Sequence, residues 1–273
     1  MVTPRSYEVS LKNNWWRRNL TLAAIALLKR FRPYWSQVLL LTPGICIKYG
    51  KFQHLSSAEA MQIIASNTSM PVPKIYCAFE RKGITYIVMS RLKGLPIGSN
   101  WSQRSDQSKK KLLEQLKGYI DEMRSLKPPA VGVVEGVNGT MLYDLRVSSD
   151  MEGYGPFDSI PSFHSFLTNA VEQSTDQFPE INQLLSMYQT SQFTTCFTHG
   201  DLNSANILVD GDRISGIVDW DTCGWYPEYW EYTTAWNVNP YNEFWREEVG
   251  KFLVEYPDAL RMEEIRRKYF GDF

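Results

Sequence analysis

The chain has few cysteines, and their spacing argues against both a zinc site and a disulfide framework. Four occur in 273 residues, and no two of them form a Cys-x-x-Cys pair. Closely spaced pairs are the usual signature of cysteine zinc sites and of small disulfide-linked domains. We therefore expect reduced thiols and a cytoplasmic protein. The four residues are Cys46, Cys77, Cys196 and Cys223.

The chain also lacks a charge surplus and a long apolar run. Lys and Arg number 29 against 30 Asp and Glu, a net charge of −1 that gives no electrostatic footprint for nucleic acid. The longest candidate membrane segment, Leu20–Leu28, has nine residues, whereas a spanning helix needs about 20. Basic residues flank it and no small-residue cleavage site follows, so a signal peptide is not predicted. It forms either an extra helix packed on the rest of the protein or a membrane-surface helix.

A glycine-rich phosphate loop is missing as well. Between Gln37 and Lys51 the chain offers only Pro43-Gly44 and a distant Gly50, with neither a GxGxxG nor a Walker motif. The turn between the first two strands is therefore expected to be very short. The remaining composition, 43% hydrophobic and 22% charged, is that of an ordinary globular protein.

The most informative segment that is present runs from Thr198 to Asp221, THGDLNSANILVDGDRISGIVDWD. Two apolar, β-branched arms enclose Asp-Gly-Asp, which predicts a hairpin. Such a hairpin returns Asp219 beside Asn206, so we expect Asp201, Asn206 and Asp219 to converge at one end of a small sheet. Carboxylate and amide oxygens are ligands that suit Mg²⁺.

These residues carry a family resemblance. His199-Gly200-Asp201-Leu202-x3-Asn206, followed by Ile217-Val218-Asp219-Trp220, resembles the signature of the aminoglycoside phosphotransferases, in particular their fungal branch. It is also similar to the protein-kinase catalytic loop, with Gly200 where protein kinases usually carry arginine. The resemblance implies an α+β, two-lobed protein-kinase-like fold, with a small antiparallel-sheet N-lobe and a mainly helical C-lobe. It also implies transfer of the γ-phosphoryl group of ATP, or sometimes GTP, to a hydroxyl of a small molecule.

The resemblance assigns roles to the acids of this segment. It implies that Asp201 is the catalytic base, that His199 supports the loop, and that Asn206 and Asp219 hold Mg²⁺. Phosphoryl transfer requires positioning and charge stabilisation of this kind. Asp221 is either a further metal ligand or a solvated or helix-capping acid.

A cation for the phosphates is expected on the strand around Cys46. Alternation places Lys48 on the same strand face as Cys46. In the family a helix acid pairs with this lysine, and Glu59 is the candidate here. The alternative is a capping box, Ser56-x-x-Glu59, in which the glutamate bonds back to the start of the helix.

Two further strands are predicted at Ile75–Phe79 and Thr85–Met89, joined by a turn at Arg81-Lys82-Gly83. The segment after them corresponds to the family's hinge. The resemblance implies that the backbone near Ser90 and Leu92 binds the adenine edge, with Met89 as gatekeeper. We accordingly expect an N-lobe over residues 1–92, a hinge near 90–94 and a C-lobe over 93–273.

The second lobe is expected to be helical. Leu112, Leu113, Leu116, Ile120 and Met123 recur at helical spacing, as do Phe163, Phe166, Leu167, Ala170 and Val171. After Asp221 the chain is rich in aromatic residues interleaved with Glu228 and Glu231. The rings either pack the lobe or, together with these two acids, hold a cationic acceptor through cation–π contacts and ion pairs.

Three other classes of protein compete with this interpretation. A protein kinase would share the acids but not Gly200, and this chain lacks an APE-like segment after Asp219. A glycosyltransferase with a DxD at Asp219-x-Asp221 would leave His199 to Asn206 unexplained. The third is a kinase-fold protein that has lost phosphoryl transfer and binds a ligand or catalyses another reaction. The preferred hypothesis is an ATP- and Mg²⁺-dependent small-molecule kinase.

Overall fold

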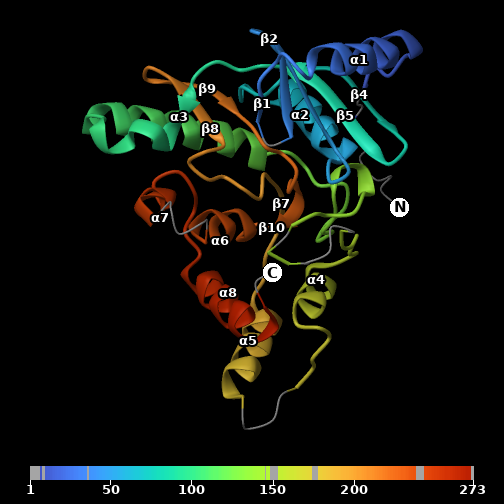
Figure 1. The fold of residues 1–273 in the computed structure, drawn as a ribbon. Coiled ribbons are helices and arrows are strands. Elements are labelled where there is room, and N and C mark those ends of the chain that lie inside the picture. Colours follow the sequence, from blue (N-terminus) through green and yellow to red (C-terminus); the bar gives the residue numbers. More distant parts are fainter. Residues whose placement is uncertain are drawn as a thin grey trace. The chain divides into compact units, whose positions relative to one another are not determined.

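The computed structural model describes residues 7, 10–35, 37–144, 146–147, 153–173, 178–237 and 243–271. The chain forms two compact units, each built from separate stretches of sequence. The sheet unit comprises Tyr7–Met123 and Ser204–Asp221, and the helical unit comprises Arg124–Asn203 and Thr222–Phe273. Figure 1 traces the elements of both along the chain.

An antiparallel sheet in the order β1-β2-β3-β5-β4 is the centre of the sheet unit. Pro43-Gly44 alone separates the second and third strands, which confirms the very short turn expected from the sequence. Lys82 and Gly83 join the last two with φ angles of +53° and +67°, the conformation of a tight hairpin turn. The strands are β1 (Tyr34–Trp35), β2 (Val38–Thr42), β3 (Ile45–Gly50), β4 (Ile75–Arg81) and β5 (Ile84–Ser90).

Two helices accompany this sheet. Helix α1 (Trp15–Leu28) begins at Asn14, whose side chain accepts a hydrogen bond from the Arg17 N–H. Its residues Leu22 and Ile25 pack on a cluster formed by Cys77, Phe79 and Tyr86, so the helix is packed on the sheet. Helix α2 (Leu55–Asn67) packs against β4 and β5.

The start of α2 excludes the capping box. The residue that precedes the helix is His54, and Ser56 is already inside it. A capping box requires its serine at the N-cap, where the hydroxyl can reach the backbone three residues on. Glu59 therefore lies within the helix, one turn from its start.

A second, smaller sheet in the order β6-β8-β9 completes the sheet unit. The predicted hairpin is present, with Ile207 opposite Ile217 in β8 (Ile207–Asp210) and β9 (Arg213–Ile217). The side chain of Gln115 accepts from the Ile214 N–H at 3.2 Å and donates to the Asp212 carbonyl at 2.9 Å. The other elements are β6 (Leu95–Pro96), the 3₁₀ helix η1 (Ile97–Gln103) and α3 (Asp106–Arg124).

These contacts explain why the division of the chain differs from the expected lobes. Segments after the hinge, from β6 to α3 and the β8–β9 hairpin, cluster with the sheet and not with the later helices. Besides the Gln115 bonds, the Ile217 N–H donates to the Pro71 carbonyl and Glu122 binds Ser69. The lobe boundary near 90–94 thus stays a prediction, whereas the compact units are discontinuous in sequence.

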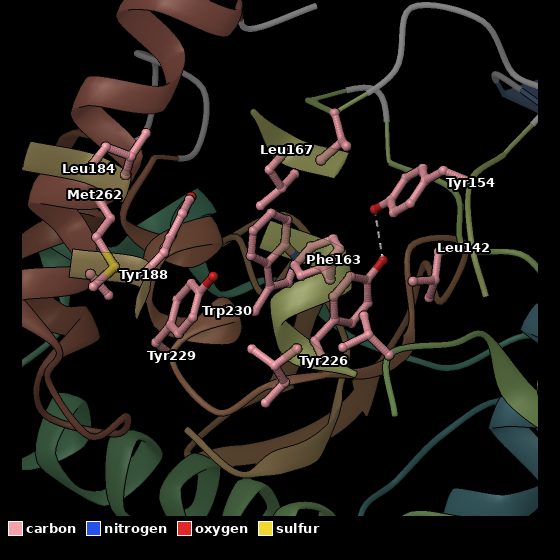
Figure 2. Packing of buried hydrophobic residues seen from close by; sticks show 14 of the residues in the cluster. Leu142, Tyr154, Phe163, Leu167, Leu184, Tyr188, Tyr226, Tyr229, Trp230 and Met262 are labelled. Carbon is pink, nitrogen blue, oxygen red and sulfur yellow. Dashed lines mark hydrogen bonds between the residues drawn. The ribbon is translucent and has the colours of Figure 1, made fainter. Parts of the chain in front are cut away.

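The helical unit is organised around an aromatic core. Phe163, Tyr226, Tyr229 and Trp230 lie at its centre, each almost completely buried, and the Tyr154 and Tyr226 hydroxyls are 3.0 Å apart (Figure 2). The elements are η2 (Val137–Gly139), α4 (Ile160–Leu167), α5 (Pro179–Thr190), β7 (Thr195–Thr198), β10 (Gly224–Pro227), α6 (Trp230–Trp236), α7 (Glu243–Val249) and α8 (Pro257–Phe270).

Helical periodicity predicts the buried face of one helix but overextends another, in which Phe166 is 38% exposed instead of buried. All five apolar residues of the first predicted series, in α3, are buried. In the second series the helix α4 ends at Leu167, because Asn169 and Ala170 adopt left-handed φ angles of +52° and +56°. The expected continuation through Val171 is therefore wrong. Among the described residues, no helix is both long and apolar enough to cross a bilayer.

Candidate active site

The donor side of the candidate site is a cavity of about 350 Å³ within the sheet unit. Its volume lies in the range of small-molecule pockets. Lys48 and Cys46 enter it from the same face of β3, as strand alternation predicts, and α1 packs on the opposite face. The wall also contains predicted site residues from two further segments. They are Met89, Ser90, Leu92, Asn206, Asp219 and Asp221.

Lys48 is held between two carboxylates. Its Nζ lies 2.6 Å from Asp219 Oδ1 and 2.6 Å from Asp221 Oδ2. Burial alone would lower the pKa of Lys48, but the charges of Asp221 and Asp219 outweigh burial and the pKa is raised. The ammonium group is therefore charged at neutral pH and is shared by two acids, which leaves the cluster with a net negative charge.

The hairpin places these acids in the cavity as the sequence predicts. The Val218 N–H donates to the Asn206 carbonyl at 3.0 Å, so the return strand brings Asp219 back beside Asn206. Between the two acids, Trp220 is fully buried and its Nε1–H donates to the Ile217 carbonyl at 3.0 Å. With Trp220 anchored inward, Asp219 and Asp221 both face the cavity.

Asp219 adopts an unusual backbone conformation. Its φ is +67°, in the left-handed region that few residues other than glycine enter. Aspartate is one of the residues that tolerate it, at a cost of about 1 kcal/mol or more. Such strain is typical of functional sites, and here it directs the carboxylate toward Lys48.

Two further predictions on the donor side concern Glu59 and Leu92. The ion pair of Lys48 with Glu59 stays a prediction, since the bonds described for Lys48 go to Asp219 and Asp221. Leu92 packs tightly on β9, where a Cβ at Gly216 would come within 2.1 Å of its Cδ1. Glycine at this position therefore lets Leu92 line the cavity.

The predicted catalytic loop belongs to the helical unit, where it follows β7. This strand pairs with β10, and Thr198 lies opposite Gly224. Gly200 has a φ of +80°, and a Cβ there would lie 2.6 Å from the Thr222 carbonyl oxygen. No side chain fits, which is the physical reason that an arginine cannot replace this glycine here.

A buried carboxylate holds the backbone of this loop. Glu231 in α6 is fully buried, and it accepts the His199 N–H at 2.6 Å and the Gly200 N–H at 3.0 Å. Burial raises the pKa of Glu231, and the His199 charge and N–H partly oppose it. The idea that Glu231 holds a cationic acceptor is therefore wrong, because solvent and ligands do not reach it.

An arginine supports the loop from another direction. Arg146 forms a two-pronged ion pair with buried Asp144, at 2.7 and 2.8 Å, and its guanidinium also donates to the Gly200 carbonyl. Burial would lower the pKa of Arg146, but the charges of Asp144 and Asp201 raise it. This guanidinium is therefore a fixed positive charge near the Asp201 carboxylate.

Asp201 itself is tied into the loop. Its N–H donates to His199 Nδ1 at 3.2 Å, and its Oδ1 accepts from Asn203 at 3.0 Å. His199 is completely buried, and the Thr222 hydroxyl donates to its carbonyl at 3.0 Å. Asp201 and Asn206 belong to different compact units, so the expected approach of Asp201 to the metal-binding residues stays a prediction.

Sequence reasoning did not anticipate the roles of Arg146, Asp144 and Glu231. No sequence motif marks Arg146 or Asp144. The only signal at Glu231 was an acidic residue among aromatic ones. The rings around it are mostly core, as one of the two interpretations expected. Buried ones are Trp225, Tyr226, Tyr229, Trp230, Tyr232 and Trp245, while Tyr241 lies outside the described residues.

Solved structures show which fold these elements form. The apo form of a thermostable mutant of the aminoglycoside phosphotransferase APH(4)-Ia matches with a TM-score of 0.59 at 13% identity, over 88% of this chain and 87% of that one. A variant in ternary complex with ADP and hygromycin B gives 0.61 at 13%, over 88% and 86%. The gentamicin complex of APH(2")-IIa gives 0.58 at 15%, over 96% and 89%. The fold is the mixed α+β, protein-kinase-like fold of these enzymes.

Sequence comparison identifies the family. The phosphotransferase enzyme family matches residues 53–265, and the chain belongs to this family. The aminoglycoside 3'-phosphotransferase of Niallia circulans is 27% identical over 171 residues. That match spans 61% of this chain and 58% of the relative, less than two thirds of its length.

Proposed function

We propose that this chain is a Mg²⁺-dependent kinase that transfers the γ-phosphoryl group of ATP, with GTP as an alternative donor, to a hydroxyl group of a small molecule. The observation that carries the proposal is the cluster in which Lys48 is shared by Asp219 and Asp221 at the wall of a cavity. The ammonium and the acids are the charges that a nucleotide triphosphate and its metal ion require. Membership of the phosphotransferase family supports the same chemistry.

On the donor side, Lys48 would turn from the acids to the α- and β-phosphates, with Glu59 as its supporting partner. The adenine edge would meet the segment after β5. There the N–H groups of Ser90 and Arg91 already donate to carbonyls of neighbouring segments, at 2.9 and 3.0 Å. The Leu92 N–H is therefore the donor we assign to the base, with Met89 at the back of the cavity.

The oxygen ligands of the cavity fit a magnesium ion. Asn206, Asp219 and Asp221 offer an amide and two carboxylates, and Mg²⁺ completes such a set with waters and substrate phosphates. In the described part of the chain Asp221 Oδ1 is buried without a hydrogen-bond partner. No cluster of three or more His, Cys, Asp or Glu suited to a metal occurs among those residues, and the proposed set accordingly includes the Asn206 amide. When bound, Mg²⁺ would neutralise part of the negative charge of the phosphates.

On the acceptor side, Asp201 would take the proton of the attacking hydroxyl. The new bond joins the acceptor oxygen to the γ-phosphorus, the bond from that phosphorus to the β–γ bridging oxygen breaks, and the nucleoside diphosphate leaves. Glu231 and Arg146 hold the backbone on either side of Gly200, which keeps the Asp201 carboxylate in a fixed orientation. His199 supports the same loop through its Nδ1.

The acceptor is proposed only as a small molecule with a hydroxyl group. Relatives named above act on or bind aminoglycosides, but the rings after Asp221 in this chain are mostly core. We therefore propose an endogenous or secondary-metabolite hydroxyl. Membership of the fungal branch and a cytoplasmic location stay predictions.

Calorimetric titration with Mg²⁺-ATP and Mg²⁺-GTP, followed by a γ-phosphate transfer screen over metabolite hydroxyls, tests the proposal. We expect Asp201→Ala to abolish transfer while nucleotide binding persists, and Asp219→Ala to weaken binding of the Mg²⁺-nucleotide. Asp121→Ala, which removes an exposed carboxylate on α3, serves as the matched control. Near-normal transfer by Asp201→Ala would refute its role as base.

The rival function is a kinase fold that no longer transfers phosphate. The two-residue turn at Pro43-Gly44 favours this rival, because so short a turn cannot enclose phosphates as a glycine-rich loop does. Nucleotide binding without transfer to any acceptor would support this rival. Absence of nucleotide binding would contradict the proposed kinase and support this rival more strongly.

A further inference from the structure

Helix α1 has two apolar faces, and only one of them packs against the described part of the sheet unit. Leu22 and Ile25 pack against the sheet. Residues on the other side of the helix are large, apolar and exposed. Within the helix, Trp15 is 64% exposed, Trp16 70%, Leu20 67% and Leu27 70%, and Phe31, just after its end, is 80% exposed.

Helical spacing joins Trp16, Leu20 and Leu27 into one stripe. Trp16, Leu20 and Leu27 follow at i, i+4 and i+11, and the exposed residues between them on this side are Ala23, Ala26 and Asn19. A surface helix normally carries charged residues on the face away from the core. This helix carries none there, so its outer face is suited to an apolar environment.

The surroundings of the stripe are strongly basic. From Val9 to Arg32 the sequence contains six Lys and Arg and no Asp or Glu, although the net charge of the whole chain is −1. Lys29, Arg30 and Arg32 are exposed directly after the helix, while Arg17 and Arg18 lie at its start. Tryptophan and leucine beside basic residues are typical of helices that lie in the interface of an anionic bilayer.

Arg17 and Arg18 also fix the orientation of the helix on the sheet. Arg17 donates to the Tyr76 carbonyl at 2.9 Å, and the Arg18 guanidinium lies 5.3 Å from the Phe79 ring centroid. At the other end, the Lys29 ammonium lies 5.5 Å from the Tyr34 ring. Both ends are thus attached to the sheet unit, and the apolar stripe stays on the outside.

We propose that the outer face of α1 is a docking surface for an anionic lipid membrane, on which the helix lies parallel to the surface. A second copy of the chain is the weaker occupant, because pairing two such helices would bring two acid-free, basic segments together. Like charges at an interface oppose association, whereas anionic headgroups complement them. None of the described helices is long and apolar enough to span the bilayer.

Cosedimentation of the full chain with phosphatidylcholine vesicles containing 30% phosphatidylserine, against pure phosphatidylcholine, is the test. We expect binding to the anionic vesicles that weakens as salt is raised. The double variant Leu20→Glu/Leu27→Glu should bind at least tenfold more weakly. Val131→Glu/Val254→Glu, with the same added charge at side chains exposed by 99% and 62%, should stay within twofold of the unmodified chain.

Several results would overturn the proposal. No binding to anionic vesicles, or equal loss in both double variants, would remove the specific role of the stripe. A dimer in light scattering that only Leu20→Glu/Leu27→Glu dissociates would assign the face to a second copy. Tighter binding of a short RNA than of the vesicles would assign the basic segment to nucleic acid. Circular dichroism of each variant reports folding, and since the changed leucines are exposed, their α-helical signal should persist.

Discussion

A buried histidine should make the stability of the helical unit sensitive to mild acid. His164 in α4 is only 4% exposed, its ring stacks on Tyr188 with centroids 3.9 Å apart, and its Nε2 lies 2.8 Å from the Tyr229 hydroxyl. Burial lowers the pKa of His164 from 6.5 to about 4. The folded chain therefore favours the neutral imidazole.

The sign and size of the effect follow from this shift. A lowered pKa gives stability that is present above pH 6.5 and is lost as the pH falls toward 4, because the unfolded chain takes up the proton first. At about 1.4 kcal/mol per pKa unit, the full loss is about 3 kcal/mol. Roughly 2 kcal/mol of it should already be lost between pH 7 and pH 5. That is a large part of a typical stability of about 5–15 kcal/mol.

Urea unfolding followed by tryptophan fluorescence from pH 7 to pH 4.5 measures this loss. Carboxylates also titrate in this range, so the informative quantity is the difference between the unmodified chain and His164→Gln. The glutamine can still bond to the Tyr229 hydroxyl but does not take up a proton. We expect the variant to lose about 2 kcal/mol less than the unmodified chain between pH 7 and pH 5. Identical losses in the two proteins would refute the assignment.

Two substitutions test the two halves of the candidate site. Lys48→Met leaves Asp219 and Asp221 without their shared cation, and we expect the dissociation constant of Mg²⁺-ATP to rise at least about tenfold, since a charge-assisted hydrogen bond contributes about 1.5–3 kcal/mol. Unchanged affinity in calorimetry would contradict a phosphate contact for this lysine. Glu231→Ala leaves two buried N–H groups without an acceptor, at about 1–3 kcal/mol each, so urea unfolding should show a loss of at least about 2 kcal/mol. Full stability in this variant would show that water or another group replaces the carboxylate.

Local sequence signals predicted the elements that carry the donor side of the site. The hairpin between β8 and β9 follows from β-branched arms around Asp-Gly-Asp, because turn geometry and alternation act over a few residues. The same holds for the two-residue turn at Pro43-Gly44 and for Lys48 facing the same side as Cys46. Where a local signal competed with backbone geometry it failed, as in α4, whose end is set by the left-handed Asn169 and Ala170.

Contacts between distant segments decided the rest. The amino-acid sequence by itself determined the family motif, the hairpin and the apolar faces of the helices. Only the tertiary structure decided that Lys48 bonds to Asp219 and Asp221, 171 and 173 positions away, and that Glu231 holds the loop at Gly200. The physical reason is that spacing constrains neighbours along the chain, whereas the partner of a buried charge is chosen by packing, which depends on every segment that meets there.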